Sequence, residues 1–246
     1  MRLICINGWS ASAALLEGFT ECLSKTHEVI VLDHLYQYAW DEVRARLDSL
    51  IEKDTVLMGW SLGGMLALRY VQESLTAQHR LKALVLLQVP PCFMQKTDWP
   101  SGVSAEAFAS LQGMVEERKA IKLARHFSQL MIAGSDDVST ERKIVKAQYH
   151  EENLPDWPVL STGLNLLKTL DLRDSPATLS LPIFGLYGEK DALISPEVSG
   201  YFREHYLRFK AVSLPGMGHF PFGRHVQALA RKIDDFLLET ADESYS

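Results

Sequence analysis

The chain has 246 residues, 47% of them hydrophobic and 23% charged, an ordinary composition for a globular protein with one large folded unit or two small ones. Its formal net charge of −6 argues against a nucleic-acid-binding protein, because contacts to phosphates need a concentrated basic surface. Three scattered cysteines suit neither a disulfide framework nor a zinc site, so we expect reduced thiols and no bound metal or cofactor. No run approaches the roughly 18 apolar residues of a membrane span, and the first residues lack a signal-peptide pattern. We therefore expect a cytoplasmic protein that binds neither membranes nor nucleic acids and works as a monomer.

Short apolar runs alternate along the chain with longer amphipathic stretches. The runs predicted as strands buried on both faces are residues 3–6, 29–32, 55–58, 83–87, 183–187 and 211–214. The stretches predicted as helices are residues 13–23, 40–51, 62–78, 196–206 and 226–238. This alternation implies a mostly parallel sheet with helices on both faces. The active sites of such sheets lie in loops at the carboxyl ends of the strands.

The alternation is interrupted once, between residue 93 and about residue 175. This part of the chain has a helical pattern with loop signals, and it contains no convincing strand. We interpret it as a helical cap, inserted after the strand that ends near Gln88 and lying over the carboxyl edge of the sheet. The chain is thereby divided into a core domain, residues 1–92 and 176–246, and a cap, residues 93–175.

Residues 59–63 read GWSLG, a G-x-S-x-G pattern centred on Ser61. An apolar strand precedes it and an amphipathic helix follows, which is the setting of a nucleophile elbow. The glycines remove side chains that would collide with the backbone of a strained turn, and the helix N-terminus favours developing negative charge at the serine. The pentapeptide alone could be a glycine-rich turn with an incidental serine, but its flanking elements indicate a nucleophile.

A serine nucleophile needs a neighbouring imidazole to take its proton, and eight histidines are present. His219 is the preferred base, because its glycine-containing loop follows the last predicted strand and so lies at the same sheet edge as Ser61. His34 also follows a strand and is the rival base. The remaining histidines are interpreted as solvated, namely His27, His79, His126, His150, His205 and His225.

The acid that orients the imidazole is predicted to be Asp191, which follows the penultimate strand at the same edge. Glu189 is a nearby alternative, and either carboxylate could instead cap the helix predicted from residue 196. An oxyanion hole needs two backbone amides. We assign them to Leu62, directly after the nucleophile, and to Trp9, in the loop after the first strand.

Several segments together resemble a known family, the pimeloyl-[acyl-carrier protein] methyl ester esterases of biotin synthesis, which have the α/β-hydrolase fold. They are residues 7–9, 59–64 and 187–191, residues 91–93 and 98–100 at the cap entrance, and residues 163–173 at the cap exit. The triad motif is shared by many hydrolases, whereas the cap segments are more specific. Three features depart from the family: Asn7 replaces a histidine, residues 34–38 replace a Gly/Ser-rich turn, and Met1 already stands at the first buried strand. We therefore expect a sheet of about six strands.

The resemblance implies a serine carboxylesterase that converts the methyl ester of pimeloyl-acyl-carrier protein to pimeloyl-acyl-carrier protein and methanol. It implies a substrate site made by Trp9, Ser61, Leu62 and His219 together with a cap segment that lines the acyl channel, Phe127, Ser128, Gln129, Leu130 and Met131. The apolar face of residues 120–131 would also include Ile121, and it could equally be plain core between cap and sheet.

Two groups of basic residues lie in the cap of an otherwise acidic chain, at positions 118–125 and 142–146. Acyl-carrier proteins are acidic, so the resemblance makes Lys122, Arg125, Arg142 and Lys146 the expected carrier-docking residues. Ordinary solvated helix faces are the alternative. Two other functions also remain open. One is a different capped serine hydrolase, such as a short-chain carboxylesterase or a C–C bond hydrolase. The other is a non-catalytic ligand-binding protein of the same fold.

Overall fold

A computed structural model describes residues 1–173 and 179–242 of the chain. At its centre is one sheet of six strands in the order β2-β1-β3-β4-β5-β6, with every neighbouring pair parallel. The strands are β1 Arg2–Ile6, β2 Glu28–Leu32, β3 Thr55–Trp60, β4 Leu81–Leu87, β5 Ile183–Gly188 and β6 Phe209–Leu214. The predicted mostly parallel sheet of about six strands is confirmed.

The central strands are buried on both faces, as predicted, but the two edge strands are not. Along β2 and β6 most residues are only half-buried or exposed, whereas β3 and β5 are buried throughout. An edge strand has a neighbour on one side only, and its flank is left beyond the covering helices. The apolar pattern of β2 therefore predicted more burial than the structure has.

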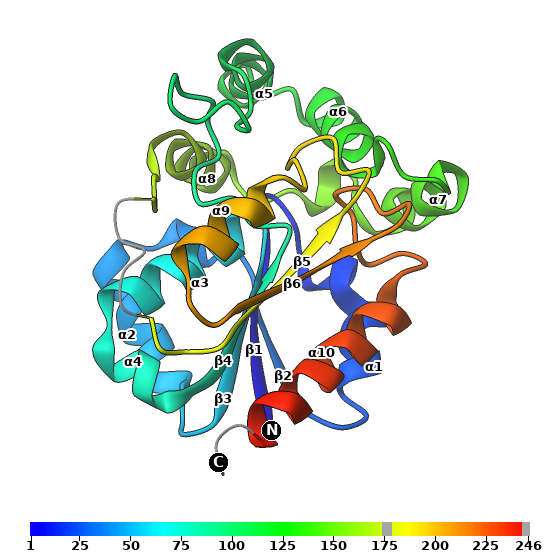
Figure 1. Cartoon of the computed structure of the whole chain (residues 1–246). Coiled ribbons are helices and arrows are strands. Elements are labelled where there is room, and N and C mark those ends of the chain that lie inside the picture. Colours follow the sequence, from blue (N-terminus) through cyan, green and yellow to red (C-terminus); the bar gives the residue numbers. More distant parts are fainter. Residues whose placement is uncertain (174–178, 243–246) are drawn as a thin grey trace.

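Helices cover both faces of the sheet (Figure 1). The α-helices are α1 Glu17–Leu23, α2 Trp40–Leu50, α3 Leu62–Glu73, α4 Leu75–Arg80, α5 Ala105–Glu116, α6 Ala120–Ile132, α7 Val138–Gln148, α8 Trp157–Thr169, α9 Val198–His205 and α10 Val226–Asp242, and the 3₁₀ turns are η1 Ala13–Leu16, η2 Leu35–Gln37 and η3 Glu151–Asn153. On one face lie α1 and α10, and on the other lie α2, α3 and α4. Gln72 near the end of α3 donates to the hydroxyl of Tyr206, which follows α9.

Two predicted helices are broken in the structure. The stretch 62–78 divides at Ser74, whose backbone is extended and whose hydroxyl accepts a hydrogen bond from the Ala77 amide at 3.1 Å. Serine in this position caps a new helix instead of continuing the old one. The stretch 13–23 begins as a 3₁₀ turn and becomes α-helical only from Glu17.

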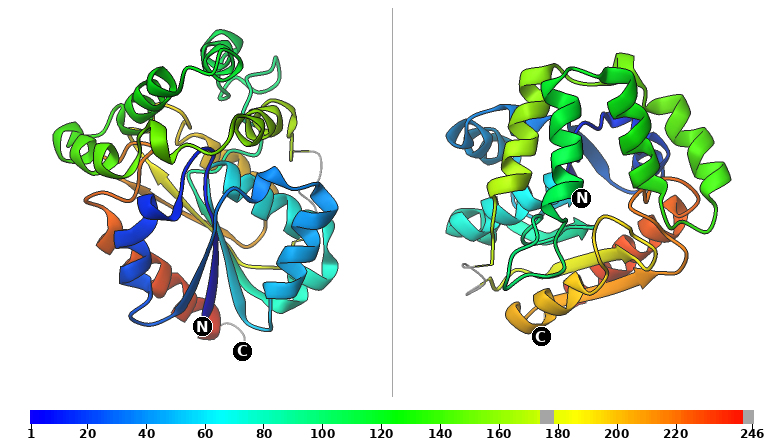
Figure 2. Two further views of the ribbon diagram at one scale, coloured as in Figure 1. Left: turned by 180° about the vertical axis from the view of Figure 1, so that it is seen from behind. Right: turned by 90° about the horizontal axis from the view of Figure 1, so that it is seen from above.

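Four helices, α5 to α8, lie across the carboxyl edge of the sheet, and we call them the cap (Figures 1 and 2). The chain enters and leaves this layer at one place, because Cys92 and Asp171 form a β-bridge. Three ion pairs among four side chains hold this crossing together. Asp171 is 2.6 Å from both Lys96 and Arg173, and Arg173 is 3.0 Å from Asp98. Together these pairs hold the cap entrance against the cap exit.

The three cysteines are free, and burial raises the pKa of the Cys5 thiol to about 12.

His27, predicted to be solvated, is instead largely buried, and its imidazole lies 2.7 Å from the carboxylate of Asp234 on α10. The loop position of His27 gave no sign of this partner 207 residues away. None of the helices described here is both long and apolar enough to cross a bilayer.

Candidate active site

Three side chains from the ends of β3, β5 and β6 form one hydrogen-bonded row. Nδ1 of His219 is 2.8 Å from Oδ2 of Asp191, and Nε2 of His219 is 3.2 Å from Oγ of Ser61. The Asp191 and His219 side chains are only 1% and 2% exposed, whereas Ser61 is partly open to solvent. A carboxylate facing Nδ1 favours the tautomer with its proton there, so that Nε2 can accept the serine proton. This is the arrangement of a charged acid, a base and a nucleophile.

The turn that carries Ser61 is strained in the way a nucleophile elbow requires. Ser61 has φ +52° and ψ −121°, outside the regions that L-residues prefer. A Cβ on Gly63 would lie 2.2 Å from the carbonyl oxygen of Ile6, and one on Gly59 would lie 2.5 Å from the nitrogen of Gly64. Only glycine fits at these two positions, which explains the G-x-S-x-G spacing.

The two oxygens of Asp191 have separate partners. Oδ1 accepts hydrogen bonds from the amides of Leu193 and Ile194 at 2.8 and 2.9 Å, which leaves Oδ2 to face His219. The alternative acid, Glu189, is exposed, and in the described chain its carboxylate does not bond to the imidazole.

The rival base, His34, lies elsewhere in the site. Its Nδ1 is 3.2 Å from the hydroxyl of Tyr36, and within the described residues it makes no hydrogen bond to Ser61. Burial lowers the pKa of His34. The structure thus brings His219 and Asp191 to Ser61, and it places His34 and Glu189 outside that row.

In the loop after β1, one backbone amide has no hydrogen-bond acceptor among the described residues. The amide of Gly8 donates to Oδ1 of Asn7 at 3.0 Å, and that of Ser10 donates to the Tyr36 hydroxyl at 2.9 Å. Among the residues described, the Trp9 amide between them donates to none, nor does the Leu62 amide at the start of α3. Two such amides are what an oxyanion hole requires.

Asn7, which departs from the family pattern, supports this loop. While its side-chain oxygen holds Gly8, its Nδ2 donates to Asp33 at 3.0 Å beyond the end of β2. The other oxygen of Asp33 accepts from the Ala13 amide at 2.9 Å. The Asn7 side chain thus acts as a hydrogen-bond donor and an acceptor at once, and it links the loop to the end of the neighbouring strand.

Cap residues that the sequence did not single out reach the same loop. Nε1 of Trp9 donates to the Leu160 carbonyl on α8 at 3.0 Å, and the Ser10 hydroxyl lies 2.7 Å from that of Tyr149, directly after α7. Phe127 packs edge-on against the Trp9 ring at 4.9 Å. These contacts join residues more than 100 positions apart, which no local pattern marks. Of the three cap residues, only Phe127 was expected at the site from the sequence.

The residues expected to line the acyl channel spread over several surfaces of α6. Phe127 and Met131 are buried beneath the helix, while Ser128 and Gln129 face a groove toward α7. Leu130 borders a cavity of about 640 Å³ on the other side of α6. Ile121, expected on the apolar face, is 63% exposed, because it faces the groove toward α7 together with Arg125 and Ser128.

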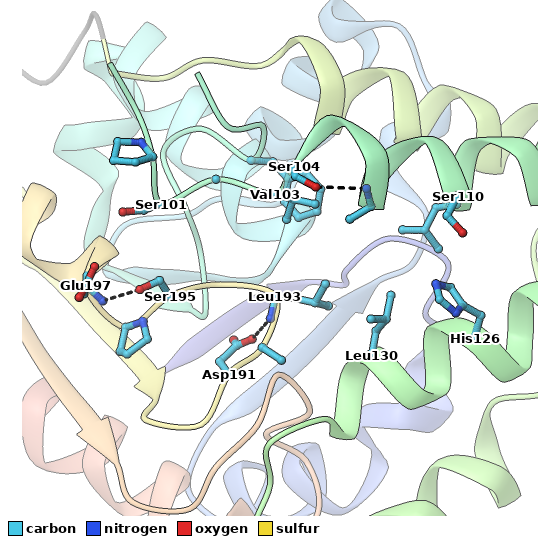
Figure 3. Close-up of a pocket in the computed structure, with 17 residues that line it drawn as sticks. Ser101, Val103, Ser104, Ser110, His126, Leu130, Asp191, Leu193, Ser195 and Glu197 are labelled. Carbon is cyan, nitrogen blue, oxygen red and sulfur yellow. Dashed lines mark hydrogen bonds between the residues drawn. The ribbon is translucent and has the colours of Figure 1, made fainter. Parts of the chain in front are cut away.

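That cavity lies between the cap and the loop that carries Asp191 (Figure 3). Leu130 and His126 of α6 border it on one side, and Leu193 and the backbone around Asp191 border it on the other. Hydroxyl groups are frequent in its lining, at Ser101, Ser104, Ser110 and Ser195. Of the catalytic row only Asp191 belongs to this lining, so the cavity adjoins the row on the side of the acid, and it has room for a small organic molecule.

The groove between α6 and α7 holds about 500 Å³ and gathers most of the residues expected to dock a carrier protein. Its lining includes Arg125, Arg142, Lys146, Ser128, Gln129 and Tyr149. Lys122 lies in a neighbouring hollow with Arg118 and Lys119. In the part of the chain described, none of Lys122, Arg125, Arg142 and Lys146 forms an ion pair. Across residues 1–173 and 179–242, no group of His, Cys, Asp and Glu side chains is arranged to hold a metal ion.

Comparison with known proteins agrees with this geometry. A model of the alpha/beta hydrolase family matches residues 3–232. A pimeloyl-[acyl-carrier protein] methyl ester esterase of Yersinia enterocolitica is 30% identical over 97% of this chain and 93% of its own, and one of Aliivibrio fischeri is 26% identical over 97% and 94%.

Among solved structures, a bromoperoxidase from Bacillus anthracis has a TM-score of 0.82 at 19% identity, covering 96% of this chain and 91% of that one. An esterase from Exiguobacterium antarcticum has a TM-score of 0.81 at 15% identity, with the same coverage. At such low identity these two share the fold alone. The family match and the two sequence relatives go further: the chain belongs to the alpha/beta hydrolase family, and within it to the pimeloyl-[acyl-carrier protein] methyl ester esterases.

Proposed function

We propose that the protein is a serine carboxylesterase that hydrolyses the methyl ester of pimeloyl-acyl-carrier protein, releasing methanol, in biotin synthesis. The observation that carries this proposal is the hydrogen-bonded row Asp191–His219–Ser61 in a chain whose sequence relatives bear that name. We extend the proposal to a monomeric enzyme of the cytoplasm, with a cap domain of residues 93–175 whose C-terminal boundary lies outside the described residues.

In the first half of the reaction, Oγ of Ser61 attacks the ester carbonyl while Nε2 of His219 takes its proton. The negative charge that develops on the carbonyl oxygen is received by the amides of Trp9 and Leu62. Asp191 stabilises the positive imidazolium across the 2.8 Å contact to Nδ1. His219 then returns the proton to the methoxy oxygen, and methanol leaves an acyl group on Ser61.

In the second half, a water molecule takes the place of methanol. His219 removes a proton from this water, which attacks the acyl carbonyl, and the same two amides receive the charge again. Collapse of the intermediate returns the proton to Ser61 and frees the carboxylate. No cofactor is needed at either stage, since both steps are proton transfer and acyl transfer.

The substrate carries two acyl bonds, a methyl ester at one end and a thioester to the carrier at the other. Phe127 and Leu130 belong to an apolar cap segment beside the reacting row, which suits the hydrocarbon chain between these bonds. We propose that the chain enters along α6, with Ser128, Gln129 and Met131 completing the channel. The ester then reaches Ser61 while the thioester stays outside, so chain length protects the thioester.

The carrier is proposed to dock at the groove between α6 and α7. Arg125, Arg142 and Lys146 line this groove, and Lys122 lies in the neighbouring hollow. Within the described residues none of the four forms an ion pair, so they are available for the acidic residues of a carrier protein. Such charges mainly raise the rate of encounter and select the partner.

The test is to incubate the protein with methyl pimeloyl-acyl-carrier protein and to measure both methanol and free carrier thiol. Methanol should appear without thiol, and Ser61→Ala should release neither. Release of thiol would mean that the thioester is the true target and would contradict the proposal. Hydrolysis of small esters alone would make the protein a short-chain carboxylesterase.

A further inference from the structure

Gln88 follows β4 directly and is completely buried, yet it takes no part in the chemistry proposed above. Its φ of +51° is in the left-handed region, where glycine and asparagine are favoured. In the described chain, its side-chain oxygen Oε1 is buried with no hydrogen-bond partner. Both features are unfavourable for stability, so an apolar residue would be the simpler choice at a place that needed only filling.

The side-chain nitrogen of Gln88 has a specific partner, the carbonyl oxygen of Gly218, which precedes His219 in the chain. The orientation of the amide is determined by this contact, because only Nε2 can donate to a carbonyl oxygen. The next carbonyl, that of His219 itself, accepts a hydrogen bond from Nε1 of Trp60 at 3.2 Å. Two neighbouring strand ends therefore hold the two peptide groups that flank the imidazole.

The same strand end also holds the nucleophile. The amide of Ser61 donates to the carbonyl of Leu87 at 3.0 Å, and Leu87 is the residue before Gln88. The amide of Gln88 in turn donates to Leu186 on β5 at 2.8 Å. One rigid corner at the end of β4 is thus bonded to the turn of Ser61 on one side and to the loop of His219 on the other.

We propose that Gln88 is a positioning residue for His219, and that its hydrogen bond to Gly218 sets the distance between the imidazole and Ser61. The proposal rests on the proposed Ser61–His219 pair but on no particular acyl substrate. Without the bond, the loop of His219 can shift relative to the elbow, and the 3.2 Å contact between Nε2 and Oγ lengthens. Because Gln88 is buried, the change should affect turnover and leave substrate binding intact.

The first test compares Gln88→Met with Gln72→Met, using hydrolysis of p-nitrophenyl butyrate. Both variants replace a glutamine whose Nε2 donates to a backbone carbonyl, but Gln72 bonds to Leu172, outside the triad loops. We expect Gln88→Met to lower kcat by about 10-fold to 100-fold with KM unchanged, since small displacements of catalytic groups have effects of this size. Gln72→Met should keep the kcat of the wild type. Equal kcat in the two variants would overturn the proposal.

The second test uses Gln88→Glu and separates positioning from mere folding. A protonated glutamic acid can donate to the Gly218 carbonyl, whereas its ionised form repels it. His219, Asp191 and Tyr187 are the other ionisable groups near the site. They are common to both proteins, so a pH dependence of the ratio of variant to wild-type kcat comes from residue 88, directly or through its charge. That ratio should fall as pH rises and recover when the pH is lowered again. A ratio of variant to wild-type kcat that is independent of pH would overturn the proposal, even if Gln88→Met is inactive or unfolded. Loss of activity in Ser61→Ala tests the nucleophile separately.

Discussion

The two carboxylate oxygens of Asp191 have different roles in the site. Its Oδ1 is committed to the amides of Leu193 and Ile194, and its Oδ2 to the imidazole of His219. An asparagine cannot preserve both sets of hydrogen bonds. Its side-chain nitrogen would face either the two amide donors or the proton on Nδ1. Asp191→Asn should therefore lower kcat by about 10⁴-fold, and Ser61→Ala or His219→Ala by about 10⁵-fold to 10⁶-fold, as in other triads. Steady-state hydrolysis of p-nitrophenyl esters measures all three.

Covalent labelling tests the nucleophile by itself. A fluorophosphonate should modify the wild-type protein at Ser61 alone, because only this hydroxyl has an imidazole within hydrogen-bond distance and two free amides nearby in the described site. Peptide mapping by mass spectrometry locates the label. Full labelling of Ser61→Ala would assign the nucleophile elsewhere, and normal activity in His219→Ala would return His34 to consideration.

The sequence allowed the chemistry at this scale to be predicted, but not its supports. Ser61 could be predicted because the glycines that make room for its turn are two residues away on either side. Gln88 and Tyr149 could not, since their partners, Gly218 and Ser10, are more than 100 residues distant and no local pattern marks such a contact. Asn7 could be recognised as a departure from the family, but its bond to Asp33 depends on how two strand ends meet.

The cap helices support the active site. The hydroxyl of Tyr149, after α7, lies 2.7 Å from that of Ser10 beside the proposed oxyanion amide of Trp9. Tyr149→Phe leaves the buried Ser10 hydroxyl unpaired, which should lower the free energy of unfolding by about 1–3 kcal/mol. It should also lower kcat for every ester, since the loop loses its hydrogen bond to the end of α7. Thermal unfolding and kcat measure the two effects, with Tyr38→Phe as the control. An unchanged kcat would mean that the loop is held without α7.

The basic face of α6 and α7 allows an independent prediction. Reversing Arg142 and Lys146 to glutamate should lower kcat/KM for the carrier-bound ester by about 10-fold at low salt and flatten its dependence on ionic strength. Hydrolysis of a short p-nitrophenyl ester should be nearly unchanged. The matched control reverses Arg231 and Lys232 on α10, away from the cap (Figure 1). Equal loss with both substrates would indicate a damaged cap, and loss with neither would place carrier docking elsewhere.

Element boundaries were harder to predict than the elements. The six strands were found from their apolar runs, and their order along the chain implied a parallel sheet. The break at Ser74 was missed, because a serine inside an amphipathic pattern is tolerated in helices as well as favoured at caps. The exposure of Ile121 was missed because an apolar residue was assigned to the buried face, although it lies about 120° around α6 from Phe127.

At the scale of the whole molecule, one buried carboxylate should make stability depend on pH. Glu141 on α7 is fully buried, and burial raises its pKa from 4.5 to about 7. Between these values the folded chain keeps a proton that the unfolded chain releases, so stability falls as pH rises from about 4.5 to about 7 and stays lower above that. Glu141→Gln should therefore raise the free energy of unfolding by about 1–3 kcal/mol at pH 8 and change it little at pH 4.5.

Urea denaturation at the two pH values provides the measurement. Glu106→Gln, at an exposed position of α5, is the control and should change stability little at either pH. A Glu141→Gln variant less stable than the wild type at pH 8 would mean that the ionised carboxylate is favourably solvated or paired in the folded state.

The bridge between Cys92 and Asp171 makes the whole cap an interchangeable part. Since the chain enters and leaves the cap at two residues that are bridged to each other, material can be added to or removed from the segment between them without displacing any strand of the sheet. The entropy of closing such a loop grows only slowly with its length. The catalytic row is supplied entirely by the sheet ends, so the core can keep one chemistry while successive caps present it to differently shaped substrates. Substrate range can thus change with the cap, provided that the new cap still supports the loop of Trp9 and Ser10.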